Sequence, residues 1–234
     1  MGSSRFPGKI LELINNKPQL VFQYERLTKS KLADKVVVAT SESYKDNLVE
    51  KLCITNDIQF YRGSEEDVLD RYYKASLCFK ADLIIRCNAD CPFIDPDIVD
   101  KVINAWHSLD NIDYASNILE ETFPLGMHTE VFSLGALKRA FDNAKGSDER
   151  EHVTPYIYRN PDKFKLVNLK NKEDLSHHRW TVDYKEDLEF INKVVEHLDD
   201  KKDTFTMMDV VKLLEIKPEI QAINSKYKKS QNLL

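Results

Sequence analysis

Two aspartates each follow a short apolar run in this sequence of 234 residues. Asp90 comes shortly after Leu83-Ile84-Ile85, and Asp183 closes the segment Arg179-Trp-Thr-Val-Asp183 just before a predicted helix. Carboxylates at the ends of two strands of one sheet meet at one edge, where open α/β sheets bind ligands. Such a pair can hold a magnesium ion that bridges phosphate oxygens. We therefore predict Asp90 and Asp183 as metal ligands, although each aspartate taken alone is also explained as a cap of a turn or a helix.

A loop rich in small residues opens the sequence, Met1-Gly-Ser-Ser-Arg-Phe-Pro-Gly-Lys9. Small residues let backbone N–H groups come close to an anion, and Arg5 and Lys9 add positive charge. The loop is not a Walker A motif, because Ile10 follows Lys9 where Ser or Thr is needed. The pattern predicts a phosphate-binding loop, and a flexible polar terminus would look similar.

The elements that must position these residues alternate between strand and helix in the first half of the chain. Apolar runs predict strands at 35–40, 58–61 and 83–85, and helical spacing predicts helices at 18–31, 41–52, 67–79 and 96–106. This alternation favours an α/β fold with a mostly parallel sheet and helices on both faces. In the second half we expect strands at 113–116, 128–133, 164–169 and 178–182, the last two paired, and helices at 134–144, from 147, at 184–198 and at 206–214. We expect one domain over 1–234, with excursions at about 117–133 and 164–180.

The composition of the chain argues against several classes of protein. The content of 42% hydrophobic and 31% charged residues is that of an ordinary globular protein, and the net charge of -5 argues against a nucleic-acid partner. No apolar run approaches the roughly 20 residues of a membrane span. The four cysteines form no C-x-x-C pair, and Cys87 and Cys91 are expected to be buried thiols. These features favour the reducing cytoplasm.

Several spaced motifs resemble one enzyme family. Gly2-Ser-Ser-Arg-Phe-Pro-Gly-Lys9 is similar to the signature loop of the sugar-acid cytidylyltransferases, the group that makes CMP-KDO and CMP-sialic acids. The SpsF branch of spore-coat polysaccharide biosynthesis looks similar in four further runs, Arg62-Gly-Ser-Glu-Glu-Asp-Val-Leu-Asp-Arg-Tyr72, Asp90-Cys-Pro-Phe-Ile-Asp-Pro96, Glu149-Arg-Glu-His-Val-Thr-Pro-Tyr156 and Thr181-Val-Asp-Tyr-Lys-Glu-Asp-Leu188. The resemblance extends to about Leu198. It implies a three-layer, Rossmann-like (GT-A-like) nucleotidyltransferase fold with a small β arm. It also implies transfer of CMP from CTP to an acidic sugar, with release of pyrophosphate.

The resemblance also implies roles for individual residues. Gly2, Ser3, Ser4, Arg5, Gly8 and Lys9 would wrap the triphosphate, with Arg5 and Lys9 as the catalytic cations. Asn88 would lie near the cytosine or the ribose, and Asp90 and Asp183 would bind Mg²⁺. The candidates for binding the sugar are His128, Glu130, Arg150, His152 and Arg179. Relatives usually form homodimers through an arm, which residues 128–133 and 164–169 would supply here.

Two departures from the family pattern leave alternatives open. Relatives have a strand and then Gln-Ala-Arg before the loop, whereas this sequence begins at Met1. We therefore expect the first strand of the family's sheet to be missing. Either the given start is internal, or the chain is truncated, with impaired folding and activity. The SpsF branch usually carries Leu-Asp where Met127 and His128 stand. The alternative functions are a nucleotidyltransferase with another base or acceptor, and an inactive, truncated nucleotide-binding paralogue. A GT-A glycosyltransferase is disfavoured because Asn88-Ala-Asp90 holds one aspartate instead of Asp-x-Asp.

Overall fold

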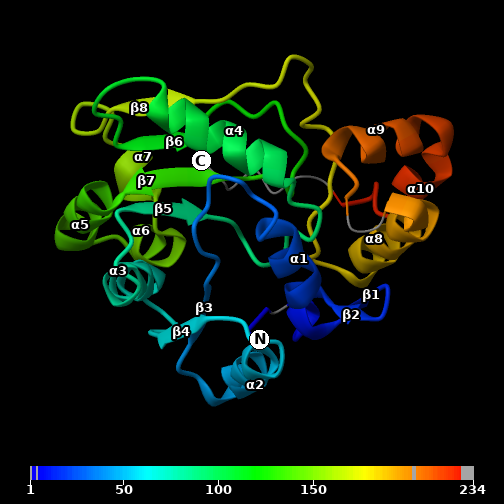
Figure 1. Cartoon of the computed structure of the whole chain (residues 1–234), viewed down its shortest axis with the longest axis horizontal. Helices are drawn as coiled ribbons and strands as arrows, with labels where there is room; N and C mark the ends of the chain where they lie inside the picture. The colour runs from blue at the N-terminus through cyan, green and yellow to red at the C-terminus, as the bar shows by residue number, and fades with distance from the viewer. Residues whose placement is uncertain (1, 4, 202–203, 228–234) are drawn as a thin grey trace.

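The computed structural model describes residues 2–3, 5–201 and 204–227, and it shows a mixed β-sheet with helices on both faces (Figure 1). The sheet has the strand order β5-β7-β6-β8, made by β5 (Leu83–Arg86), β6 (Tyr114–Ser116), β7 (Glu130–Ser133) and β8 (Leu166–Asn168). Strand β7 is antiparallel to both β5 and β6, whereas β6 and β8 are parallel. The α/β class is confirmed. The sheet has more antiparallel pairing than the alternation predicted, because β7 returns between β5 and β6.

The two faces of the sheet follow the alternation of side chains along its strands. Helix α4 (Pro96–His107) packs on the face that carries Ala115 and Val131. The opposite face, with Tyr114 and Phe132, is covered by α3 (Val68–Cys78), α5 (Leu134–Asn143) and α7 (Pro155–Tyr158). Helix α6 (Ser147–His152) lies beside α3 on that side (Figure 1). The expected three layers are therefore present.

The strands expected in a small β arm belong to the main sheet instead. Strand β7 is hydrogen-bonded on both sides, and three of its four residues are buried. Strand β8 pairs with β6 rather than with residues 178–182. The latter make only an isolated parallel β-bridge, between Arg179 and Leu125, in which Leu125 N donates to His178 O and Trp180 N donates to Leu125 O. The predicted dimer contact through residues 128–133 therefore has no free strand edge in β7.

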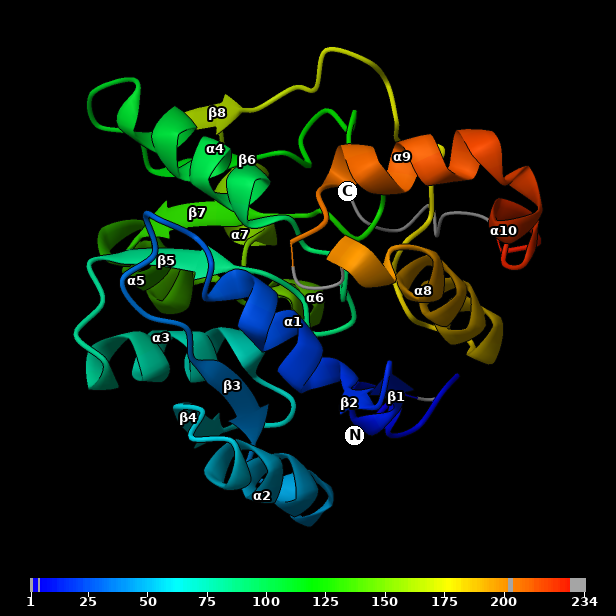
Figure 2. The same cartoon turned by 45° about the vertical axis from the view of Figure 1, so that its right-hand side comes forward.

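A second group of helices stands beside the sheet, made by α8 (Lys185–His197), α9 (Met207–Ile216) and α10 (Pro218–Ala222) (Figure 2). Its core surrounds Phe93, Trp180 and Phe205. The hairpin of β1 (Leu13–Ile14) and β2 (Lys17–Pro18) and the helix α1 (Gln19–Leu27) connect this group to the first half of the chain. Short 3-10 turns occur at η1 (Lys9–Leu11), η2 (Tyr44–Asp46) and η3 (Asp199–Lys201). No helix in the described ranges combines the length and the apolar character needed to cross a membrane.

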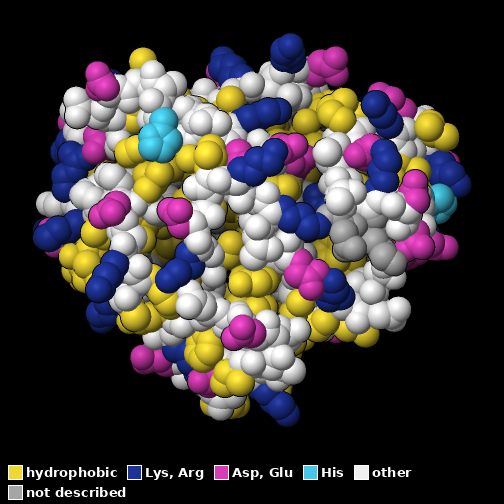
Figure 3. Space-filling model, viewed as in Figure 1, with side chains coloured by type: hydrophobic (Ala, Val, Ile, Leu, Met, Phe, Trp, Pro, Cys, Tyr) yellow, Lys and Arg dark blue, Asp and Glu magenta, His cyan; other side chains and the backbone are white. Residues whose placement is uncertain are grey.

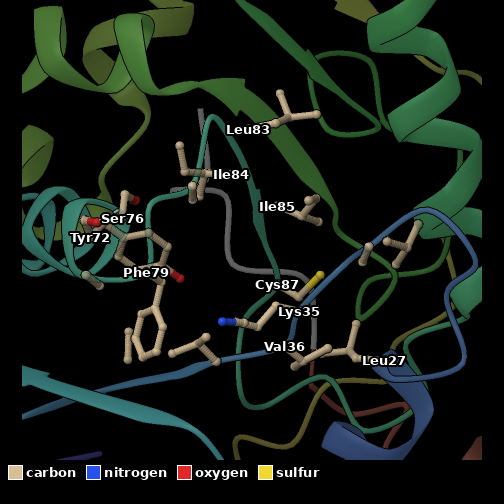
Figure 4. Close-up of a pocket in the computed structure, with 16 residues that line it drawn as sticks. Leu27, Lys35, Val36, Tyr72, Ser76, Phe79, Leu83, Ile84, Ile85 and Cys87 are labelled. Carbon is tan, nitrogen blue, oxygen red and sulfur yellow. Dashed lines mark hydrogen bonds between the residues drawn. The ribbon is translucent and has the colours of Figure 1, made fainter.

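A separate parallel pair, β3 (Val38–Ser41) and β4 (Phe60–Gly63), packs against α2 (Asn47–Thr55). A cavity of 180 Å³ separates β3 from β5, with residues 36–39 on one side and 83–85 on the other (Figure 4). Tyr72 and Phe79 close it from the α3 side. Among the described residues β3 pairs only with β4, and β5 only with β7, so one edge of each strand has no hydrogen-bonded neighbour.

Candidate active site

Lys9 joins the two predicted metal ligands. Its Nζ atom lies 2.9 Å from Asp90 Oδ2 and 3.0 Å from Asp183 Oδ1. Arg5 brings a second cation to the same carboxylate, with its NH2 atom 2.9 Å from Asp183 Oδ1. The fold therefore gathers the predicted aspartates and cations, which come from three distant parts of the sequence.

Backbone contacts fix the relative position of the two aspartates. Asp90 follows β5, and its carbonyl oxygen accepts hydrogen bonds from Val182 N at 2.8 Å and from Thr181 Oγ1 at 3.1 Å. Asp183 is the next residue, two positions before α8 begins. The end of β5 and the start of α8 are thus tied together at the point where both carboxylates emerge.

Helix α1 holds the segment before Asp90 from the other side. Gln19 Nε2 donates to Ala89 O at 3.1 Å, and Gln23 Nε2 donates to Asn88 O at 2.7 Å. Both glutamines are buried. These bonds set the backbone of Asn88, whose side chain is the candidate contact to the nucleoside.

The charges at this point stabilise one another. Burial by itself would raise the pKa of Asp183, but the charge of Lys9 and the hydrogen bonds from Lys9 and Arg179 outweigh it and hold that pKa below its ordinary value. Burial likewise works against the charged form of Lys9, and the carboxylates of Asp90 and Asp183 overcome it and raise the pKa of Lys9. Lys9 is therefore a permanent cation at neutral pH.

The opening loop is shaped by local contacts. Gly8 has a φ of 75°, a left-handed conformation that glycine adopts without strain, and η1 begins directly after it. Ser3 Oγ accepts a hydrogen bond from Phe6 N at 3.3 Å, and the Phe6 side chain is buried. Gly2 is exposed, and Ser4 lies outside the described residues. The geometry anchors the loop, and its contact with phosphate stays a prediction.

The residues present fit a magnesium ion. The carboxylates of Asp90 and Asp183 already converge on one cationic nitrogen, Lys9 Nζ. Magnesium often binds one or two protein carboxylates and completes its octahedron with water and substrate phosphates. No group of three or more His, Cys, Asp or Glu side chains suited to a metal occurs in the part of the chain that the structure describes. An ion held by these two aspartates would take its other ligands from water and the substrate.

The aspartates border a cavity of 570 Å³. Most of the predicted binding residues line it as well, namely Arg5, Asn88, His128, Glu130, His152 and Arg179. Polar side chains that the sequence analysis did not single out complete the wall, among them Arg86, Thr154, Tyr158 and Arg159. Residues predicted to bind the nucleotide and residues predicted to bind the sugar thus line the same cavity.

Glu130 organises the acceptor side of the cavity. It is buried, and its carboxylate accepts hydrogen bonds from Arg86, from Thr154 Oγ1 and from Tyr114 Oη, the last at 3.0 Å. The Nε atom of Arg86 has no hydrogen-bond partner among the described residues. The Glu130 carboxylate is thus already hydrogen-bonded within the protein. Its ion pair with Arg86 holds that side chain at the wall of the cavity.

The two histidines of this side differ in their surroundings. Burial lowers the pKa of His128, so its ring is neutral at neutral pH. Its Nε2 atom lies 3.7 Å from Glu121 Oε1, beyond hydrogen-bond distance. His152 is exposed at the end of α6. His128 is therefore available as a neutral donor or acceptor, and His152 is reachable from solvent.

Two of the predicted acceptor residues have other partners. Arg150 does not border the cavity: its guanidinium binds both carboxylate oxygens of Asp67 and donates to Phe141 O at 2.9 Å. Arg150 thus links α6 to α3, and its contact with substrate stays a prediction. Arg179 does border the cavity, but its guanidinium is held by Asp183 and Asp187.

The sequence analysis missed Arg86 and Asp187. Arg86 is the last residue of β5. A charged residue at the end of an apolar strand was the sequence feature that could have identified it as a site residue. Asp187 accepts hydrogen bonds from the backbone N–H groups of Asp183 and Tyr184. Asp187 stands in the first turn of α8, where acidic residues are common because they interact favourably with the helix dipole. Its type and position therefore did not indicate a role in the site.

The fold and site together define a nucleotidyltransferase with a Rossmann-like topology. A solved structure of a cytidylyltransferase from Leptospira borgpetersenii serovar Hardjo-bovis is similar, with a TM-score of 0.90, 32% identity, and coverage of 99% of this chain and 95% of that one. A family model described as Cytidylyltransferase matches residues 1–220, and the chain belongs to this family of CTP-using enzymes.

Two relatives add detail. The spore coat polysaccharide biosynthesis protein SpsF of Bacillus subtilis is 34% identical over 94% of this chain and 92% of its own length. A 3-deoxy-manno-octulosonate cytidylyltransferase of Chlamydia trachomatis is 28% identical over 68% of this chain and 62% of its own length. The resemblance to the SpsF branch and the enzyme class predicted from the motifs are thus confirmed.

Proposed function

We propose that the protein transfers the CMP group of CTP to a hydroxyl of an acidic sugar, of the nonulosonic or ulosonic type, and releases pyrophosphate. The observation that carries this proposal is the position of Lys9 between Asp90 and Asp183, beside a cavity of 570 Å³. A volume of this size suits a small-molecule site. The carboxylates would hold Mg²⁺, which neutralises phosphate charge when it is bound.

The chemistry requires positioning and charge neutralisation more than covalent catalysis. The sugar hydroxyl attacks the α-phosphorus of CTP in line, the bond from that phosphorus to the bridging oxygen breaks, and pyrophosphate leaves with the bonding electrons. Lys9 and Arg5 would contact the phosphate oxygens as charge develops on them. Asn88 would contact the cytosine or the ribose.

The acceptor is proposed to be acidic for two reasons. The relatives named above act in polysaccharide biosynthesis and on 3-deoxy-manno-octulosonate, according to their names. In this chain Arg86, Arg159 and His152 line the cavity and offer donors to a carboxylate and to hydroxyls. The product would then be a CMP-sugar for the synthesis of a surface polysaccharide or another glycan.

We also propose that the enzyme works in the cytoplasm as a homodimer. All four cysteines are free thiols, as expected in a reducing compartment. The homodimer is supported by the family resemblance alone, and size-exclusion chromatography with light scattering would test it.

The function is tested by pyrophosphate release with CTP, Mg²⁺ and a panel of acidic sugars, with matched neutral sugars and with ATP, GTP and UTP as controls. We expect release with CTP and one acidic sugar, and loss of release in Asp90→Ala and Asp183→Ala. Asp97→Ala is the matched control, because Asp97 is exposed on α4. Release with neutral sugars alone would overturn the acidic acceptor, and the absence of CTP binding would favour the inactive paralogue.

A further inference from the structure

Asp187 supports Asp183 from within the fold. Asp187 is fully buried, and its Oδ2 atom accepts hydrogen bonds from Asp183 N at 2.9 Å and Tyr184 N at 3.0 Å. Arg179 bridges the two carboxylates, with its Nε atom 3.1 Å from Asp187 Oδ1 and its NH2 atom 2.8 Å from Asp183 Oδ2. Both the backbone and the carboxylate of Asp183 thus depend on Asp187.

Asn224, which follows α10, completes this network. Its Nδ2 atom donates to Asp187 Oδ1 at 2.9 Å and to Arg179 O at 3.1 Å. Asn224 is itself buried. A buried carboxylate is costly when one of its donors is removed, so this contact from a distant part of the chain constrains Asp187 and Arg179 together.

Tyr227 makes an independent contact to the same region. Its ring stacks on Tyr184, with ring centroids 3.8 Å apart and an interplanar angle of 2°. The guanidinium of Arg5 lies 5.5 Å from the centroid of the Tyr184 ring, within the range of a cation–π interaction. Tyr227 Oη also donates to Glu186 Oε2 at 2.9 Å. The Tyr184 ring therefore contacts both Arg5 of the opening loop and Tyr227.

We propose that residues 224–227 are a positioning element of the active site, which holds Asp183 through Asp187 and Arg5 through Tyr184. Asn224 and Tyr227 do not border the cavity, so they act through these neighbours and not on the substrate. Figure 2 shows the helix that leads into this segment, α10, beside α8, the helix that Asp183 precedes. This inference rests on the proposed function, because it assigns Asp183 to the metal and Arg5 to the triphosphate.

The two contacts predict separable defects. Asn224→Ala would loosen Asp183, and we expect the Mg²⁺ concentration for half-maximal effect to rise about tenfold and kcat to fall about tenfold, as is common for residues behind a metal ligand. Tyr227→Ala would loosen Arg5, and we expect KM for CTP to rise by about the same factor. Tyr227→Phe keeps the stacked ring and should reverse most of the rise in KM for CTP that Tyr227→Ala causes. Glu219→Gln changes an exposed side chain on α10 and should match the wild type.

Two measurements test these expectations on the full chain. One is the thermal stabilisation by CTP as a function of Mg²⁺, which needs no sugar, and the other is the steady-state rate of pyrophosphate release. A folded Asn224→Ala with wild-type Mg²⁺ dependence, together with a Tyr227→Ala with wild-type KM, would overturn the inference. If Asn224→Ala does not fold, Asn224→Leu, which is close to asparagine in size and has no donor, is judged by the same criterion.

The design separates this inference from the proposed function. A wild type that binds CTP with Mg²⁺ but reacts with no sugar contradicts the acceptor and still allows the binding test of Asn224 and Tyr227. A wild type that does not bind CTP overturns both proposals.

Discussion

Lys9 Nζ lies 2.9 Å from Asp90 Oδ2, although 81 residues separate the two in the sequence. The contact joins the opening loop to the end of β5, and the same ammonium reaches Asp183. Two carboxylates thus fix the position of one cation. Preorganisation of this kind lets an enzyme stabilise developing charge without reorganising its site.

Replacing Lys9 by methionine should lower the rate of pyrophosphate release about 100- to 1000-fold, the usual cost of removing one donor to a transition-state charge. Methionine keeps an unbranched side chain of similar length and loses the charge and the hydrogen-bond donors of Lys9. Lys193→Met is the control, because Lys193 is exposed on α8 and pairs only locally with Glu196. A fall of less than about tenfold would show that Lys9 has no catalytic role.

The two aspartates should act as one unit. We expect Asp90→Asn and Asp183→Asn each to remove the Mg²⁺-dependent thermal stabilisation by CTP, and the double variant to be little worse than either, because groups that share one ion are not additive. Removal of the ion with EDTA should abolish activity, and added Mg²⁺ should restore it. Asp97→Asn serves as the control. Full activity in EDTA would contradict the metal site.

His178 should make the folded protein sensitive to mild acid. Its side chain is buried, and burial, reinforced by the charge of neighbouring His177, lowers the pKa of His178 to about 4. Histidine in an unfolded chain titrates near about pH 6.5. Between about pH 6.5 and pH 4 the unfolded state therefore binds more protons, and the free energy of unfolding falls as the pH falls.

The measurement is urea unfolding of the wild type and of His178→Gln at about pH 7 and about pH 5. We expect the wild type to lose more stability than the variant over this interval. Equal losses would show that His178 does not titrate differently in the two states.

Gly126 should tolerate no side chain. Its φ is 112°, and a Cβ atom there would lie 2.8 Å from both the carbonyl carbon and oxygen of Trp180. We expect Gly126→Ala to lower the free energy of unfolding by at least about 2 kcal/mol, because both the backbone strain and the clash must be relieved. At Gly135, near the start of α5, a Cβ atom would lie 3.7 Å from Ser133 Oγ, which is an ordinary van der Waals contact. Gly135→Ala should therefore be neutral or stabilise by up to about 1 kcal/mol. Chemical denaturation of the two variants side by side checks the difference.

Local pattern was sufficient for the parts of the fold that depend on neighbouring residues. The apolar run at 83–85 became β5, and Pro96 after the cap Asp95 began α4. The rule that strand ends meet at one edge predicted that Asp90 and Asp183 converge. Both residues reach Lys9, although residues 178–182 form no strand and are tied to Asp90 by the hydrogen bond from Val182 N to Asp90 O.

Long-range pairing explains what the sequence could not indicate. The run 178–182 has a strand-like pattern, but it makes only an isolated β-bridge, between Arg179 and Leu125. Arg150 binds Asp67, which is 83 residues away. Glu130 lines the cavity, and its carboxylate accepts hydrogen bonds from Arg86, Tyr114 and Thr154. No spacing in the sequence encodes these encounters.

The gap between β3 and β5 has a consequence for how the molecule behaves among other chains. Among the described residues, one edge of β3 and one edge of β5 have no hydrogen-bonded neighbour, and both border an apolar cavity. Unpaired strand edges are the places where one chain can add a strand to the sheet of another. Association of the chain through these edges would appear as a loss of monodispersity at high protein concentration.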